Sequence, residues 1–452
     1  MTHSGSRGSP HHENIVARSV TPQRAMRLPG MRMVDRGLAA SAMTLILAAC
    51  TSTSPTGPAR TPAPPPGTLV APSAAEASTV TPSARPTRTT TPTPRADGWR
   101  PVPDQTTVQG IQFLHVIWTG RRFVATGLEF DAGGVFLDSS DGITWHLQAG
   151  AYPEAGPGHL AVGSRGLVAV SLGAYRASWF STDGLAWTTR ADPFPLPLIG
   201  SDTVEVTDVV ATGDGWLAVG REDPPCQLDC GLAPVRAIVW TSSDGLHWTR
   251  VPDQPSLRHG AMTGVARMSS GFVAVGSVTG RAAAWTSTNG STWTAVPDEA
   301  TFQPLPGTGT GPEFWAEMSG VAVGHGVVVG VGGDGARGGG GGSARAWWSA
   351  DGRSWTEATG DRFAGGQIFG VTVTPEGFLA TGPSGEQSCL GGIWASTDGR
   401  AWQCVASDPA FADFGPYAAT ASSSVEVAVG LKALANPPPA GLPGAVWWRP
   451  LP

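Results

Sequence analysis

One short pattern, Ser-x-Asp/Asn-Gly-x-x-Trp, occurs six times along the chain and constrains its fold more than any other feature. The tryptophans that end successive copies lie 42, 61, 45, 62 and 47 positions apart. A period in the forties that lengthens only by insertions is typical of repeat architectures, in which each repeat is one supersecondary unit. The third residues of the six copies are Asp141, Asp183, Asp244, Asn289, Asp351 and Asp398.

Each copy predicts a tight turn between two antiparallel strands. Asp-Gly and Asn-Gly between apolar runs are the strongest short-range hairpin signal, because both central residues of such a turn need φ > 0. A bulky apolar residue stands two positions before each serine, as Trp240 does before Ser242, and the tryptophan follows the turn. We therefore assign the six Asp and Asn side chains a structural role in holding turns.

A second pair of strands precedes each hairpin, because β-branched runs bounded by glycine, such as residues 272–276, are too short for helices. Four strands per repeat, arranged radially, make a β-propeller. The last repeat needs both ends of the chain, since residues 99–105 resemble residues 248–254 and residues 444–449 resemble the strand before a turn. The sequence thus predicts an all-β, seven-bladed propeller over residues 98–452, closed by its N- and C-terminal strands.

The chain before the propeller divides into three predicted parts. Residues 1–30 are polar, and they are either an artefact of the choice of start site, with the true start at Met31 or Met33, or a genuine extension. Residues 31–49 have the charged and apolar regions of a secretory signal, and the apolar run is too short to span a membrane. Residues 50–97 are rich in Thr, Pro and Ser, which predicts a disordered tether after Cys50.

The signal ends in Leu47-Ala48-Ala49-Cys50, which resembles the lipobox of bacterial lipoproteins. That resemblance implies that Cys50 is diacylated and becomes the mature N-terminus, on the extracytoplasmic face of the cell membrane. Two or three acyl chains anchor a protein stably, where one does not. An ordinary signal peptide with an incidental cysteine is the alternative. We expect a monomer that touches the membrane only through this lipid.

Four cysteines remain besides Cys50, and an even number in an exported domain suggests two disulfides. Cys389 and Cys404 flank the Asp398-Gly399 turn almost symmetrically and are predicted to face each other across that hairpin. Cys226 and Cys230 are predicted to staple one long loop. A metal site at Cys226 and Cys230 is the rival interpretation, but no histidine lies nearby in the sequence.

The turn motif resembles the Asp-box of BNR-repeat propellers, a group that includes sialidases, sortilin-type receptors and photosystem assembly factors. The resemblance covers roughly residues 98–452, with one departure: the Asp-box has a residue between Asp and Gly, which are adjacent here. In that family the box is a fold element far from the active site. The resemblance therefore implies architecture, and not activity.

An enzyme of the sialidase superfamily would need a cluster of arginines, a tyrosine nucleophile with a glutamate partner and an aspartic acid. Only three tyrosines occur, and the one arginine placed on an inner strand is Arg267. Glu205 and Asp208 share an inner strand, but strict alternation predicts that they face opposite sides. A glycoside hydrolase that uses other carboxylates stays as the alternative, because paired acids need not be close in sequence.

Composition argues against several other functions. Charged residues make up 14% of the chain, the net charge is −6 and Lys432 is the single lysine, so no basic stripe for nucleic acid exists. There is no phosphate-binding or dinucleotide-binding fingerprint, because the glycine-rich residues 332–343 lack the lysine and the following helix. We predict neither a cofactor nor a metal, and interpret residues 332–343 as a loop.

Recognition through loops is the function that the sequence favours. The longer insertions between blades and between second and third strands share one face, and aromatic residues in them suit a protein or glycan partner. We predict a non-catalytic cell-surface protein that binds an envelope protein or an extracellular glycan; an assembly factor with a protein partner is a third possibility. The candidate binding rim consists of Phe194, Phe302, Trp315, Phe411 and Phe414.

Overall fold

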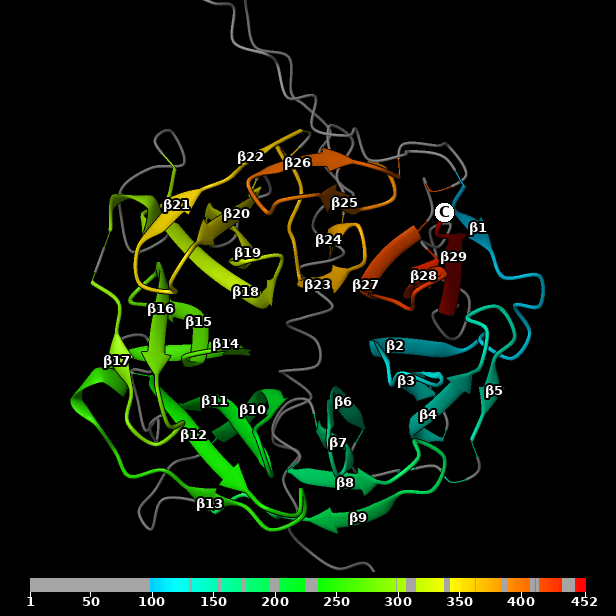
Figure 1. The fold of residues 1–452 in the computed structure, drawn as a ribbon, viewed down its shortest axis with the longest axis horizontal. Helices are drawn as coiled ribbons and strands as arrows, with labels where there is room; N and C mark the ends of the chain where they lie inside the picture. Colours follow the sequence, from blue (N-terminus) through cyan, green and yellow to red (C-terminus); the bar gives the residue numbers. More distant parts are fainter. Residues whose placement is uncertain are drawn as a thin grey trace, which may run out of the picture. The chain divides into compact units, whose positions relative to one another are not determined.

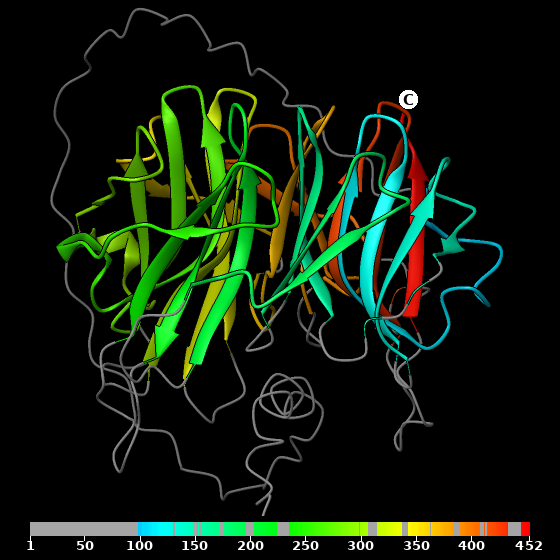
Figure 2. The ribbon, with the colours of Figure 1, turned by 90° about the horizontal axis from the view of Figure 1, so that it is seen from below.

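The computed structural model describes residues 98–129, 132–148, 150, 152, 156–171, 176–195, 203–223, 235–297, 299–305, 314–336, 342–361, 363–383, 389–406, 411, 414–432 and 444–452. These residues form seven small sheets, each built mainly of antiparallel strands and set radially around one axis (Figure 1). Side-on, the strands of each blade run between the two faces of the ring (Figure 2). Among the residues with described positions, no helix has the length and hydrophobicity needed to cross a bilayer.

The first four blades follow the chain from the axis outwards. Blade 1 contains β2 (Ile111–Trp118), β3 (Phe123–Glu129), β4 (Gly133–Ser139) and β5 (His146–Leu147). Blade 2 contains β6 (Pro157–Gly163), β7 (Gly166–Ser171), β8 (Ala177–Ser181) and β9 (Thr188–Ala191). Blade 3 contains β10 (Thr203–Ala211), β11 (Trp216–Asp223), β12 (Arg236–Ser242) and β13 (Thr249–Arg250). Blade 4 contains β14 (Gly260–Met268), β15 (Gly271–Val278), β16 (Arg281–Ser287) and β17 (Thr294–Ala295).

The remaining blades complete the ring. Blade 5 contains β18 (Phe314–Gly324), β19 (Val327–Ala336), β20 (Ser343–Ser349) and β21 (Trp355–Glu357). Blade 6 contains β23 (Gly370–Thr374), β24 (Gly377–Thr381), β25 (Ile393–Ser396) and β26 (Ala401–Cys404), with β22 (Thr359–Gly360) added parallel to β26. Blade 7 contains β27 (Phe414–Ala421), β28 (Val425–Lys432), β29 (Gly444–Pro450) and β1 (Arg100–Pro101). Short 3-10 helices, η3 (Pro255–Leu257) and η4 (Ala300–Phe302), lie in two of the connections between blades.

Blade 7 closes the propeller as the sequence predicts. The N-terminal strand β1 pairs with β29, with Arg100 opposite Trp448 and Pro101 opposite Trp447. A buried ion pair between Arg449 and Glu426 lies in the same blade, and the Arg449 guanidinium lies 5.3 Å from the ring centroid of Trp99. Because the first and last strands share one sheet, the ring has no gap at its ends.

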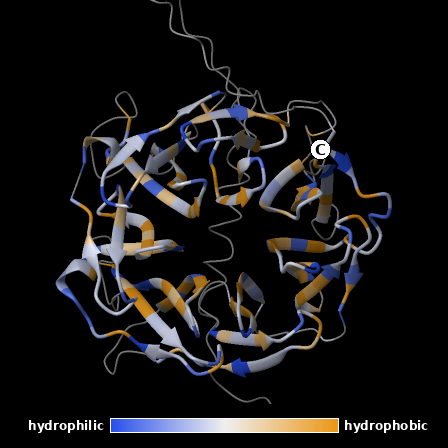
Figure 3. Ribbon diagram, viewed as in Figure 1, coloured by the Kyte–Doolittle hydropathy of each residue, from blue (hydrophilic) through white to orange (hydrophobic). Residues whose placement is uncertain are grey.

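Apolar side chains of neighbouring blades form shared cores, such as those between blades 2 and 3 and between blades 3 and 4. Hydrophobic and hydrophilic segments alternate along the strands (Figure 3). A tryptophan precedes five of the six turns and is fully buried in each case: Trp179, Trp240, Trp285, Trp347 and Trp394. In several blades its indole N–H donates to a backbone carbonyl of the preceding connection, as Trp285 does to Ser256 at 2.8 Å and Trp347 to Thr301 at 2.9 Å. Trp240, Trp285, Trp347 and Trp394 therefore each hold a connection in place as well as filling a core, whereas the indole N–H of Trp179 is buried without a hydrogen-bond partner.

The repeated turn differs from the two-residue hairpin that the sequence predicts. In the blade 3 copy only Gly245 has positive φ, at 76°, and Asp244 does not. Asp244 Oδ1 instead accepts hydrogen bonds from the backbone N–H groups of Leu246 at 2.9 Å and His247 at 2.7 Å. The side chain thus organises a longer loop, because it replaces the backbone partners that a tight turn would supply.

The turn glycine and tryptophan have separate tasks. A side chain at Gly245 would collide with Val168 of the preceding blade, so this glycine is required for close approach as well as for its conformation. The Trp248 indole N–H donates to the Gly245 carbonyl at 3.2 Å, and Ser242 Oγ accepts from the Gly245 N–H at 2.8 Å. Each turn therefore locks its own loop and rests on the blade before it.

The predicted disulfide between Cys389 and Cys404 is formed, with Cα atoms 5.4 Å apart. It links the segment before β25 to the end of β26 in blade 6. Cys50, Cys226 and Cys230 lie outside the described residues. The predicted loop at residues 332–343 is shorter than expected, because β19 continues to Ala336 and pairs there with Phe314 of β18.

Candidate functional site

A β-bulge in the inner strands decides which side chains face the propeller axis. In β10 the register shifts between Val206 and Asp208, and Val204, Val206 and Val209 all pack into the same apolar core. Glu205 and Asp208 therefore both project to the opposite side, towards the axis. The prediction that they face opposite sides is wrong, because strict alternation does not allow for the inserted residue.

The position after the bulge differs sharply around the ring. By strand register its occupants in blades 1 to 7 are His115, His159, Asp208, Gly264, Gly320, Gly370 and Ala418. The small residues lie where the inner strands nearly touch: a Cβ added at Gly264 would lie 3.2 Å from the Cα of Gly320. Large polar side chains are thus confined to blades 1 to 3 at this level.

These three polar side chains form a row across neighbouring blades, named here the His–His–Asp row. The rings of His115 and His159 have centroids 5.1 Å apart, and His159 Nδ1 lies 3.4 Å from Asp208 Oδ1. Asp208 also accepts the backbone N–H of Val265 in blade 4, at 2.8 Å. Burial, reinforced by the neighbouring His159, lowers the pKa of His115 to about 3, against the opposing pull of Asp208. His115 is therefore neutral at physiological pH.

A second set of polar groups, named here the polar sector, lies one step closer to the start of the inner strands. It comprises Gln112, Glu205, Arg221 and Glu317. Glu205 and Glu317 occupy equivalent positions in blades 3 and 5, and the buried Ala261 holds that position between them. Arg221, opposite Glu205 in the sheet, lies with Nε 2.8 Å from Glu205 Oε2.

The two carboxyl groups of the polar sector have different electrostatic surroundings. Burial raises the pKa of Glu317, the Arg221 charge lowers it and the negative charge of Glu205 raises it further. Glu205, by contrast, has its counter-ion in direct contact. The sector therefore places one ion-paired carboxylate and one carboxyl with enhanced proton affinity within electrostatic reach of each other.

Two aromatic side chains, Tyr417 of blade 7 and Phe369 of blade 6, lie beside Gln112 of the polar sector. Tyr417 hydrogen-bonds with Gln112, and burial raises the pKa of its phenol. The rings of Tyr417 and Phe369 have centroids 5.7 Å apart. Polar and aromatic groups from blades 1, 6 and 7 thus continue the wall formed by blades 3 and 5.

The predicted aromatic rim is largely buried, which corrects its assignment as a binding surface. Phe194 packs against Trp240 and Trp248, with ring centroids at 5.2 and 5.0 Å, and Phe411 stacks on Trp447 at 4.2 Å. These rings cap the apolar cores of their blades. Packing against a core tryptophan removes the apolar surface of both rings from water, which is more favourable than leaving the phenylalanine exposed. The buried members of the predicted rim are Phe194, Phe302, Phe411 and Phe414.

Trp315 is the one member of the predicted rim that stays half-exposed. It lies at the start of β18, two residues before Glu317, and its indole atoms would come within 3.3 Å of a Cβ at Gly335. It therefore lies against its own sheet at the end of the strand that carries Glu317.

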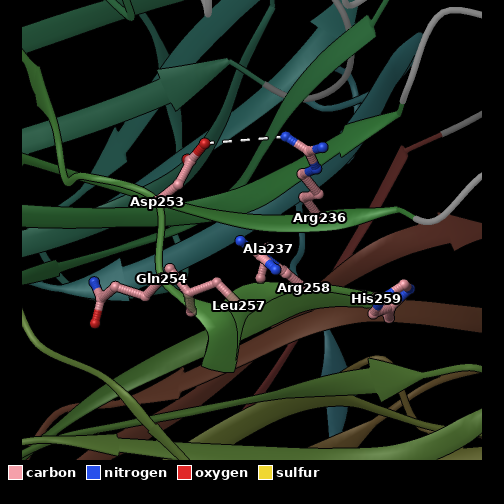
Figure 4. A pocket seen from close by; sticks show the side chains of 7 residues that line it. All are labelled: Arg236, Ala237, Asp253, Gln254, Leu257, Arg258 and His259. Carbon is pink, nitrogen blue, oxygen red and sulfur yellow. Dashed lines mark ion pairs between the residues drawn. The ribbon is translucent and has the colours of Figure 1, made fainter.

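Two hollows lie away from the axis. One, between blades 3 and 4, has a volume of about 190 Å³ and is drawn in Figure 4. The other, of about 490 Å³, lies between blades 4 and 5 and is lined by residues such as Met268, Thr286 and Arg353. Within the described ranges, no three His, Cys, Asp or Glu side chains are grouped so as to hold a metal ion.

Arg221, Glu317 and the two histidines were not singled out by sequence reasoning. The repeat itself carries the signal that finds them. Once inner strands are aligned on their bulges, charged and imidazole side chains stand out against glycine and alanine at equivalent positions. The bulge hides this signal, because the alignment slips by one residue within each inner strand.

Comparisons with known proteins identify no family for this chain. The sequence matches no protein-family model and no curated protein. A solved structure described as "YCF48 bound to D1 peptide" has a TM-score of 0.48 and 14% identity, and the alignment covers 79% of this chain and 98% of that one. A Bombyx mori GH32 beta-fructofuranosidase mutant in complex with sucrose has a TM-score of 0.34 and 12% identity, over 55% of this chain and 64% of that one. The chain is a seven-bladed β-propeller by its own strand order.

Proposed function

We propose that this protein is a cell-surface lipoprotein, anchored through Cys50, whose propeller binds an extracellular glycan at the polar sector without cleaving it. The proposal rests on one observation: Glu205, Arg221 and Glu317 lie on the axial side of the ring. Equivalent positions in other blades include glycine and alanine. Such groups are costly to bury unless they have a polar partner.

The chemistry of the polar sector suits sugar hydroxyls. A hydroxyl both donates and accepts, so it pairs with carboxylates, amides and guanidinium groups at once. The polar sector offers all three, through Glu205, Gln112 and Arg221, and Phe369 and Tyr417 supply aromatic surface beside them. A purely apolar docking surface would not need this set of donors and acceptors.

Titration calorimetry of the full protein against neutral and acidic oligosaccharides tests this proposal. The variant Glu205→Gln removes the partner of Arg221 and is expected to weaken glycan binding at least tenfold. Asp214→Asn is the matched control, because it removes the same charge from an exposed turn at the other end of the same blade. Equal affinities in both variants, or binding of an envelope protein and no glycan, would contradict the proposal.

A glycoside hydrolase is the second candidate, and the unequal carboxyl groups favour it. Hydrolysis of glycosidic bonds uses one protonated and one ionised carboxyl group. Glu317 has its pKa raised by burial, and Glu205 is ion-paired with Arg221. Release of reducing sugar by the wild type, abolished in Glu317→Gln with binding retained, would establish this activity. Binding without any release would leave the non-catalytic function.

The lipid anchor has its own test. Metabolic labelling with palmitate and membrane fractionation are expected to place the wild type in the membrane fraction with label attached. Cys50→Ser is expected to lose the label and appear in the medium or soluble exported fraction. Unlabelled wild-type protein would favour the ordinary signal peptide instead.

A further inference from the structure

The hollow between blades 3 and 4 has an unusual lining for a protein with few charged residues. Its wall comes from the start of β12 and from the connection that runs through η3 to β14 (Figure 4). Its volume of about 190 Å³ is smaller than that of a typical small-molecule pocket. The lining residues are Arg236, Ala237, Asp253, Gln254, Leu257, Arg258 and His259.

The charge of this lining is positive. Asp253 is its one carboxylate, and it lies closer to Arg250, at 2.7 Å, than to Arg236, at 3.9 Å. None of the described carboxylates forms an ion pair with Arg258. Arg236 and Arg258 thus bring two positive charges to the hollow. The one negative charge of Asp253, which lies closer to Arg250 than to Arg236, does not neutralise them.

The backbone holds these two arginines together at a cost. Arg236 and Arg258 are opposite each other in an antiparallel β-bridge, and like charges directly opposite destabilise a bridge. The next residue, His259, has φ of 64°, in the left-handed region that non-glycine residues rarely adopt. Strain of this kind persists where surrounding structure enforces it, and it concentrates at ligand sites.

The hollow lies at the same end of blade 3 as Glu205 and Arg221 of the polar sector. Arg236 lies opposite Glu222 in the sheet of blade 3, and Glu222 follows Arg221 in the chain. The ion pair between Arg221 and Glu205 and the mouth of the hollow therefore lie at the same end of this blade.

We propose that this hollow is an oxyanion subsite, in which Arg236 and Arg258 bind the carboxylate of an acidic glycan. This inference rests on the proposed function and names the class of glycan. A carboxylate matches the planar donor fork of arginine, and its charge would offset the repulsion between the two guanidinium groups. The small volume admits a carboxylate-bearing ring substituent and leaves the rest of the ligand on the surface. Sulfate and phosphate esters share this chemistry and are separated by the test.

The test is titration of the full protein with galacturonate and glucuronate oligosaccharides, their neutral counterparts, free galacturonate, a sulfated oligosaccharide and inorganic phosphate. The wild type is expected to bind the carboxylated sugars at least tenfold more tightly than the neutral ones. Arg258→Gln and Arg236→Gln are each expected to remove that preference. Arg353→Gln is the matched control, because it deletes the same charge at an exposed position beside the other hollow.

The outcomes distinguish failure of the carboxylate subsite from failure of the proposed glycan binding. Equal binding of neutral and acidic sugars, or equal effects of Arg258→Gln and Arg353→Gln, overturns the carboxylate subsite and leaves glycan binding intact. Tighter binding of sulfated sugar or phosphate, lost in Arg258→Gln, keeps an anion site but overturns the carboxylate assignment. Binding of free galacturonate that depends on Arg258, with no oligosaccharide bound, supports the subsite and contradicts the glycan function. Circular dichroism of each variant checks that it is folded.

Discussion

Single residues of the turn motif act through hydrogen bonds that the sequence pattern only partly predicts. The serine, glycine and tryptophan of the blade 3 copy bond one another, while Asp244 accepts two backbone N–H groups of its own loop. Blade 4 carries Asn289 at this position, and its Oδ1 accepts the equivalent N–H groups of Ser291 at 2.9 Å and Thr292 at 2.8 Å. The requirement is thus for an acceptor oxygen, and the charge is secondary.

A pair of substitutions at Asp244 tests that requirement. Asp244→Ala removes both backbone contacts, together with those to Ser242 Oγ and His247 Nδ1, and is expected to cost about 1–2 kcal/mol in the free energy of unfolding. Asp244→Asn keeps the acceptor oxygen, as blade 4 does naturally, and is expected to cost less than half as much at neutral pH. Denaturant titrations of both variants provide the measurement. An equal loss in the two would show that the charge, and not the acceptor, holds the turn.

His115 predicts a pH dependence of stability. In the folded protein the pKa of His115 is about 3, below the ordinary 6.5. Between these two pH values the imidazole is protonated in the unfolded chain and neutral in the folded protein. This contribution is complete above pH 6.5 and is lost as the pH falls from there towards 3, at up to about 1.4 kcal/mol per pH unit. His115→Asn is expected to flatten the loss of stability between about pH 7 and pH 5. His146→Asn, at an exposed site in β5, is the control and should leave it unchanged.

At the scale of strands and blades, the sequence predicts the hairpins and the blade number because apolar alternation and turn signals are local. It does not predict the axial wall. The bulge between Val206 and Asp208 shifts the register by one residue, so Glu205 and Asp208 face the axis together. Glu205 and Glu317 interact electrostatically only because the ring places blades 3 and 5 on either side of blade 4. The sequence also does not distinguish loop aromatics that cap a core, as Phe411 does on Trp447, from those that face solvent.

We expect the disulfide between Cys389 and Cys404 to stabilise blade 6 measurably. Cys389 and Cys404 close a loop of sequence separation 15, and a link of that length restricts the unfolded chain by about 3 kcal/mol. The double variant Cys389→Ala with Cys404→Ala is expected to lower the denaturant midpoint accordingly. Hydrogen exchange should show the added opening in β25 and β26 first. Unchanged midpoint and exchange would show that the blade is held without the covalent link.

The whole molecule depends on the seventh blade, where the two ends of the folded domain meet. Arg449 and Glu426 are 4% and 1% exposed, so removing one leaves the other charge buried and unpaired. Glu426→Gln is therefore expected to cost about 3–5 kcal/mol in the free energy of unfolding, measured by thermal and denaturant melts. Glu426→Leu combined with Arg449→Met removes both charges and should cost less. A larger loss in the double variant would contradict the account of closure.

The most direct test of the central claim is hydrogen–deuterium exchange of the full protein with and without its tightest-binding oligosaccharide. Binding at the polar sector predicts slower exchange in β10 and β18, which carry Glu205 and Glu317, and in the connection that leads to β14. Protection confined to the hollow between blades 4 and 5, or no protection anywhere, would contradict a glycan site on the axial wall.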